Sequence, residues 1–93
     1  MGLDLLDFQF RIERSFGIKV KRADLDHLPR RDPWDATAGE LHDWVLRLCA
    51  ERGAKVPSSS WHRVQKVLCD VTGKSPKLIR PETFVVRDLD FST

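Results

Sequence analysis

The chain has 93 residues, of which 41% are hydrophobic and 32% charged, and this composition excludes a disordered segment and a large multidomain enzyme. Its 16 basic and 14 acidic residues leave a net charge of +2, which argues against a nucleic-acid-binding domain, since such domains normally show a concentrated basic excess. No apolar run approaches the about 20 residues that a membrane span needs. Asp4 and Asp7 interrupt the first apolar residues, so we expect a cytoplasmic protein without a signal peptide.

Apolar residues at helical spacing predict a first helix over residues 3–16. Its apolar side chains recur at steps of three and four: Leu5, Phe8, Ile12 and Phe16. Acidic residues lie in the first turns and basic residues near the end, an order that suits the helix dipole. We expect Gly17 to end this helix. Residues 23–28 are expected to form a short helix or a single turn, followed by a polar loop over residues 29–35.

The clearest helix start lies at Thr37. Thr37 and Glu40 have the spacing of a capping box, in which the hydroxyl accepts from the amide three residues on and the glutamate reaches back. The apolar stripe that follows consists of Leu41, Trp44, Val45 and Leu48. Gly53 marks the expected end of this helix, and residues 54–60 form a linker.

A third helix is predicted over residues 61–72, capped by Ser59 or Ser60 and ended by Gly73. Residues 74–93 lack a long period, so we expect an ordered loop packed on the bundle, with room for one turn of helix. The run Phe84-Val85-Val86 favours a strand but has no evident partner. The sequence therefore predicts a single all-α domain over residues 1–93, with three main helices and one short helix.

No residue pattern indicates catalysis or metal binding, and we expect a protein that is not an enzyme. Cys49 and Cys69 fall inside apolar helical patterns and are predicted to be buried or half-buried thiols, with a disulfide open if their helices touch. The histidines are expected at the surface or its boundary: His27, His42 and His62. Arg30, Arg31 and Trp34 indicate either a small contact site or, as we favour, a solvated loop with its tryptophan against the core.

Two stretches resemble the two halves of an acyl carrier protein. Residues 2–20, from Gly-Leu-Asp-Leu-Leu-Asp-Phe to Phe-Gly-Ile-Lys-Val, are similar to the family's Asp-Ser-Leu-Asp-x-x-Glu-Leu helix, which ends in Glu-Glu-x-Phe-Gly-Ile-x-Ile. The spacing from Gly2 to Phe16 matches the family's spacing from its modified serine to its phenylalanine. Residues 37–45, Thr-Ala-Gly-Glu-Leu-His-Asp-Trp-Val, resemble the family's last helix, Thr-Val-Gly-Asp-Leu-x-Asp-Tyr-Val.

The second stretch resembles the half that comes first in the family. Residues 63–73 are similar to its Val-x-x-Ile-Leu helix and following glycine, and residues 79–89 to its Ile-x-Pro-x-Thr and Asp-Leu-Gly-x-Asp-Ser loop. Here this half comes last, so the resemblance covers nearly the whole chain in circularly permuted order. It implies an acyl-carrier-like bundle in which the linker 54–60 joins the family's usual ends.

The resemblance implies a 4'-phosphopantetheine site at the start of the first helix, where the family carries the group on a serine. Gly2 occupies that position and has no hydroxyl. Ser92 is the alternative acceptor for this cofactor. The segment Asp88-Leu89-Asp90-Phe91-Ser92 is similar to the family motif but one residue short, and Thr93 falls at the serine's register. We favour an ordinary terminal residue at Ser92.

The first helix also corresponds to the family's partner-binding helix. Asp4, Asp7 and Glu13 match its acidic positions, so the resemblance implies that they contact partner proteins. Arg14 replaces an acid and Arg11 adds a positive charge. Partners with basic docking patches, such as fatty-acid synthase enzymes, are therefore expected to bind this helix less well than they bind the family.

The leading hypothesis is an acyl-carrier-like protein, either a carrier or a carrier-derived binding module, in acyl, fatty-acid or secondary metabolism. Its partners would be acyl-metabolism enzymes or other proteins, without nucleic acid or membrane, and it would be a monomer or a swapped dimer. The alternative is a small helical protein-interaction or regulatory domain without prosthetic group. A carrier-like arrangement must bring Met1 and Gly2 close to Asp88 and Ser92. A nucleic-acid-binding domain, the third hypothesis, would need a basic face at residues 63–66.

Overall fold

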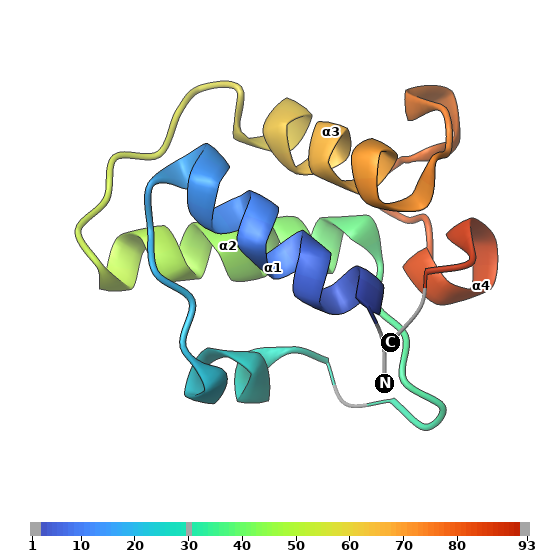
Figure 1. Ribbon diagram of the computed structural model, residues 1–93, viewed down its shortest axis with the longest axis horizontal. Coiled ribbons are helices and arrows are strands. Elements are labelled where there is room, and N and C mark those ends of the chain that lie inside the picture. The colour runs from blue at the N-terminus through green and yellow to red at the C-terminus, as the bar shows by residue number, and fades with distance from the viewer. Residues whose placement is uncertain (1–2, 30, 92–93) are drawn as a thin grey trace.

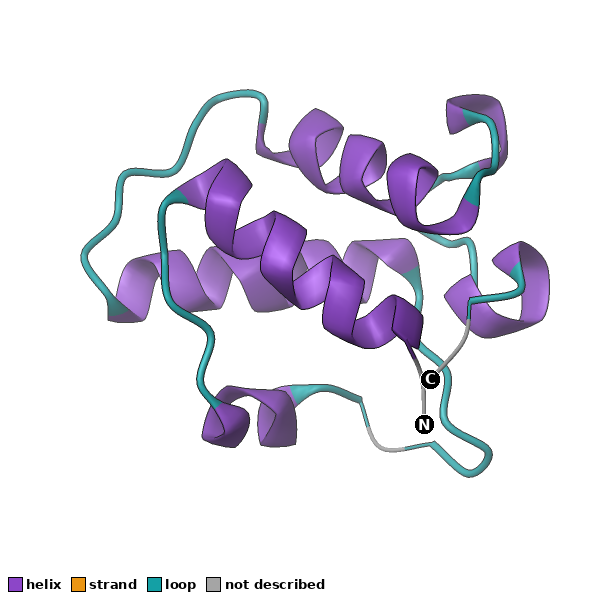
Figure 2. Ribbon diagram, in the orientation of Figure 1, coloured by secondary structure: helices purple, strands orange, loops and turns teal. Residues whose placement is uncertain are grey.

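Three long helices form the body of the protein in the computed structural model, which describes residues 3–29 and 31–91 (Figure 1). They are α1 (Leu3–Phe16), α2 (Ala38–Glu51) and α3 (Ser60–Thr72). Three short helices accompany them: η1 (Arg22–His27), η2 (Pro76–Leu78) and α4 (Val85–Leu89). Figure 2 shows helices and loops but no strand in the described part of the chain. The all-α prediction is confirmed, with three short helices in place of one.

α1 buries the stripe that its spacing predicts. Phe8 and Ile12 are fully buried and Phe16 nearly so. Gly17 follows at a φ of 65°, which confirms the predicted end of the helix because glycine adopts this left-handed conformation without strain. α3 contacts both α1 and α2, so the core lies where the apolar faces of these helices meet. No helix in the described residues is long and apolar enough to cross a membrane.

α2 begins at the predicted capping box. The Thr37 hydroxyl accepts from the Glu40 amide at 3.1 Å, and a Glu40 carboxylate oxygen accepts from the Thr37 amide at 2.8 Å. These two bonds satisfy N–H groups that the first helical turn leaves without partners. The helix ends at Glu51, with Arg52 as its C-cap, and Gly53 follows at a φ of 63°, which confirms it as the residue that marks the end.

η1 is held against α2 by Asp24. Its carboxylate accepts from the Lys21 amide at 2.7 Å and pairs with Arg52, while its carbonyl oxygen accepts from Trp44 Nε1 at 2.8 Å. Burial alone would raise the pKa of Asp24, but the Lys21 amide and Arg52 outweigh it and hold this pKa below its usual value. Of the short helix or single turn expected over residues 23–28, the short helix is therefore present, over Arg22–His27, and anchored on α2.

α3 begins at Ser60, one residue before the predicted start. Ser59 occupies the N-cap position without a side-chain capping bond. The Ser60 hydroxyl instead forms a hydrogen bond of 2.9 Å with His42 Nε2, which links α3 to α2. The His42 ring also meets the Trp61 ring edge-on, with centroids 5.6 Å apart. His42 thus lies at the boundary between helix and solvent, as predicted, and joins two helices.

The strand signal at Phe84-Val85-Val86 is wrong. Phe84 is the N-cap of α4, and the two valines form its first turn. Val85 and Leu89 lie one helical turn apart, and both are buried, so a helix serves the core better than a strand that has no partner. Only an isolated bridge between Thr37 and Phe84 remains of the strand signal. The segment predicted as a loop with one turn contains both η2 and α4.

Candidate functional site

Three aromatic rings bring the end of the described chain to the first turns of α1. Phe91 is only 2% exposed, and its ring meets Phe8 edge-on with centroids 6.3 Å apart. Trp34 covers Phe91 from the loop before α2, at 6.5 Å, and Phe8 also lies 6.4 Å from Trp44 of α2. The tryptophan of this loop therefore lies against the core, as predicted. We call this region the α1–α4 junction.

The α1–α4 junction is the place where the resemblance puts the prosthetic group. Ser92 follows Phe91 in the chain and Gly2 precedes α1. Both residues lie outside the described residues, as do Met1 and Thr93, and so does the predicted approach of Met1 and Gly2 to Asp88 and Ser92. What the described residues place together is the segment that ends at Phe91 and the first turns of α1.

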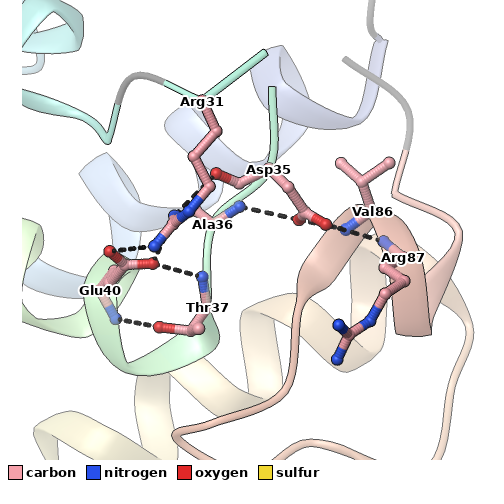
Figure 3. Close-up of polar contacts among 7 residues, drawn as sticks. All are labelled: Arg31, Asp35, Ala36, Thr37, Glu40, Val86 and Arg87. Carbon is pink, nitrogen blue, oxygen red and sulfur yellow. Dashed lines mark hydrogen bonds and ion pairs between the residues drawn. The ribbon is translucent and has the colours of Figure 1, made fainter. Parts of the chain in front are cut away.

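A carboxylate from the loop before α2 fixes α4 in this position (Figure 3). Asp35 Oδ1 accepts from the Val86 amide at 2.9 Å and from the Ala36 amide at 2.8 Å, while Oδ2 accepts from the Arg87 amide at 3.1 Å. A negative group at the N-terminus of a helix satisfies its free amides and is favoured by the helix dipole. Asp35 thus caps a helix that lies about fifty residues further along the chain.

Arg31 ties the same loop to the start of α2. Its guanidinium donates to both carboxylate oxygens of Glu40, at 2.8 and 3.1 Å, and to the Asp35 carbonyl at 3.1 Å (Figure 3). This hydrogen-bonded pairing is the main reason why the pKa of Glu40 lies below its usual value. The Phe84 ring lies under two guanidinium groups, with its centroid 5.3 Å from the Arg31 carbon and 4.4 Å from the Arg87 carbon. The loop over residues 29–35, which was expected to be solvated, is therefore held in place through Arg31 and Asp35.

Backbone hydrogen bonds complete the attachment of the last segment to α2. The Ala38 amide donates to the Thr83 carbonyl and the Gly39 amide to the Pro81 carbonyl, both at 2.8 Å. A Cβ atom at Gly39 would lie 2.9 Å from the Pro81 oxygen, so this close approach requires glycine. The segment that leads into α4 is therefore fixed by the first turn of α2.

The three acidic residues predicted to bind partners occupy different surroundings on α1. Asp4 lies in the first turn. Asp7 forms an ion pair with Arg11, one turn further along, at 2.9 Å. Glu13 accepts the Val20 amide at 2.7 Å and so fixes the chain reversal after α1. Since residues six apart on a helix point about 120° away from each other, Asp7 and Glu13 do not form one acidic row.

The described residues contain no group of three or more histidine, cysteine or acidic side chains that could hold a metal ion. Cys49 is buried and Cys69 is half-buried, as predicted, and both thiols are free. Burial raises the pKa of each thiol.

Phosphopantetheine requires a hydroxyl acceptor, and the described residues of the α1–α4 junction do not supply one. Its contacts are made by the rings of Phe8, Trp34 and Phe91, none of which carries a hydroxyl. On the sequence, the nearest hydroxyls are those of Ser92 and Thr93, which lie outside the described residues.

Comparison with known proteins gives no relative: no protein-family model, no curated protein and no solved structure matches this chain.

Sequence reasoning missed the contacts that Asp35 and Arg31 make around the junction. The local pattern around Asp35 gives no signal, because its partners Val86 and Arg87 are 51 and 52 residues away. Arg31 lies nine residues before Glu40, in a stretch whose two prolines indicate only a loop. Both contacts depend on how the helices pack.

Proposed function

We propose that this protein is an acyl-carrier-like binding module of permuted order, which acts in acyl metabolism through contacts with other proteins and carries no group at Gly2. The observation that carries the proposal is the order and packing of the helices. α1, α2 and α3 form in the stretches on which the resemblance rests, α3 packs against α1 and α2, and Phe91 meets Phe8. A bundle is defined by which apolar faces meet, so a change in chain order preserves it when the cut lies in a loop.

The residue at the start of α1 supports a protein that acts by binding partners over one that carries a prosthetic group. Glycine at position 2 has no side-chain hydroxyl to accept a phosphopantetheine. Ser92 is the alternative acceptor, and the proposal assigns it no modification. The small helical interaction domain without any link to acyl carriers stays the second hypothesis, because fold does not fix function.

The test restores the carrier order. The chain would be joined from Thr93 to Met1 and opened between Lys55 and Val56, two exposed residues of the linker between α2 and α3. We expect this reordered protein to unfold cooperatively with the helix content of the native chain. With Gly2→Ser in addition, it should gain the mass of one phosphopantetheine when incubated with coenzyme A and a broad-specificity phosphopantetheinyl transferase. The matched control is the reordered protein that keeps Gly2, which should gain nothing.

Two outcomes would contradict the proposal in different ways. A folded reordered protein with Gly2→Ser that stays unmodified would reject the likeness to carriers and leave the unrelated interaction domain. A mass gain by the native chain that disappears with Ser92→Ala would show a working carrier and reject function by contact alone.

A further inference from the structure

A groove between α1 and α3 is lined mainly by basic side chains. Figure 1 shows these helices side by side, and they contact each other directly. The groove encloses about 660 Å³. Its charged lining residues are all exposed and consist of Arg11, Arg14, Arg63, Lys66 and Asp70. Each helix contributes two of the four cations, so the groove exists only in the folded protein.

Internal contacts fix two of these cations and leave the other two available. Arg11 bridges Asp7 of its own helix, at 2.9 Å, and Asp70 of α3, at 3.8 Å. Arg63 donates to the Ser15 carbonyl near the end of α1, at 2.8 Å. Within residues 3–29 and 31–91, Arg14 and Lys66 form no hydrogen bond or ion pair. A ligand can therefore pair with these two side chains without breaking a contact of the fold.

The lining of the groove carries an excess of positive charge. With Asp7 included, four cations face two carboxylates, so this region holds an excess of two positive charges. The net charge of the whole chain is also +2. The remaining charges of the chain therefore balance in number, and the excess at the groove favours an anionic partner there.

An exposed apolar row runs along α1 up to Arg14, which lines the groove. Leu6 is 39% exposed and Phe10 is 56% exposed. These residues and Arg14 are spaced by four, and residues four apart are neighbours on a helix surface. Exposed aromatic and arginine side chains next to each other are typical of the residues that contribute most to protein–protein binding.

We propose that this surface, formed by Leu6, Phe10, Arg14, Arg63 and Lys66, binds an acidic amphipathic segment of a partner protein. Carboxylates of the segment pair with the basic side chains, and its apolar residues cover Leu6 and Phe10. Nucleic acid fits less well, because its closely spaced phosphates would also face the carboxylates that hold Arg11. The inference goes beyond the proposed function, since it uses no residue of the α1–α4 junction and holds with or without carrier ancestry.

The test uses a synthetic helical peptide with glutamate on one face and leucine on the other, titrated into the ¹⁵N-labelled native chain. We expect saturable shifts of the amide signals of residues 6–14 of α1 and 63–66 of α3, with an affinity that falls as salt is added. The double variant Arg14→Glu, Lys66→Glu should weaken binding at least about tenfold, because two attractions become repulsions. Phe10→Ser should also weaken binding, with an unchanged dependence on salt.

The matched control is the double variant Lys55→Glu, Lys77→Glu, which changes the net charge equally at exposed positions outside the groove. It should bind the peptide within about twofold of the native chain. The inference is overturned if the native chain gives no saturable shifts, or if the control loses as much affinity as the groove variant. It is also overturned if a single-stranded DNA oligonucleotide shifts the same amides with higher affinity than the peptide, because the groove would then be a nucleic-acid site.

Discussion

The starts of α2 and α4 are capped by different means. α2 begins at Thr37 and Glu40, which lie three residues apart and cap each other. α4 has Phe84 as its N-cap, whose amide donates to the nearby Asp88 carboxylate. The next free amides, those of Val86 and Arg87, are instead satisfied by Asp35, which precedes them by about fifty residues. The residues that cap α2 lie within one short stretch of sequence, whereas Asp35 reaches the amides of α4 only after the chain has folded.

Helix length explains why the two ends need different support. α2 has 14 residues, and its local cap adds to many hydrogen bonds within the helix. α4 has five residues, too few to form a stable helix by itself. It therefore depends on burial of Val85 and Leu89 and on the carboxylate that Asp35 supplies. Substitutions can weaken the support of α4 and the local cap of α2 separately.

The largest effect is expected from Phe91→Ala, which removes the ring that holds the end of α4 against α1. Phe91 is nearly fully buried between Phe8 and Trp34, so its truncation should lower the free energy of unfolding by about 3–5 kcal/mol. Urea unfolding followed by circular dichroism measures this loss. Amide exchange should accelerate more in α4 than in α2. Leu78→Ala, at a residue 57% exposed, is the control and should change stability by less than about 0.5 kcal/mol.

A loss for Phe91→Ala no larger than that for Leu78→Ala would contradict this account of the junction. It would mean that α4 is held mainly by the backbone bonds of the segment before it.

A smaller and more local effect is expected from Asp35→Ala. The substitution removes the acceptor of three amides, including those of Val86 and Arg87, and should cost about 1–2 kcal/mol. Hydrogen exchange should accelerate at Val86 and Arg87 and stay unchanged within α2. Asp35→Asn, which keeps one acceptor oxygen, should cost less. Equal acceleration in α2 and α4 would show that the two helix starts unfold as one unit and remove the contrast between them.

The three long helices could be predicted because their information is local. Apolar residues spaced by three and four, with the glycines that follow, placed both ends of α1 and α3 within one residue of the structure. The Thr37 box placed the start of α2. α4 could not be predicted in this way, because five residues are too few to show a helical period and its valines favour a strand. Its cap depends on the distant Asp35.

The surface residues of α1 show the same difference between what the local sequence indicates and what tertiary packing determines. The sequence shows Arg11 and Arg14 on one helix and Arg63 and Lys66 on another, but it does not show that these helices pair. Only their packing makes one groove of the four side chains. Glu13 matched an acidic family position in the sequence, whereas the structure shows its carboxylate bound to the Val20 amide. A residue's type can be taken from the sequence, but its neighbours depend on tertiary contacts.

The smallest effect concerns Glu40, the member of the local cap that can titrate. Glu40→Gln keeps an oxygen for the Thr37 amide, as capping boxes with glutamine do, but removes the ion pair with Arg31. Both groups are partly exposed, so the loss at neutral pH should be about 0.5 kcal/mol by urea unfolding.

The pH dependence separates the charge of Glu40 from its packing. Arg31 lowers the pKa of Glu40 in the folded protein, so the stabilisation is complete above the carboxyl's usual pKa and is lost as the pH falls through the lower, folded-state pKa. Asp24 also has a lowered pKa, but it is present in both proteins and cancels in their difference. The native chain and Glu40→Gln should therefore converge in stability as the solution becomes acidic. A difference that stays constant with pH would mean that the cap depends on the shape of the side chain and that Arg31 contributes no charge stabilisation to the start of α2.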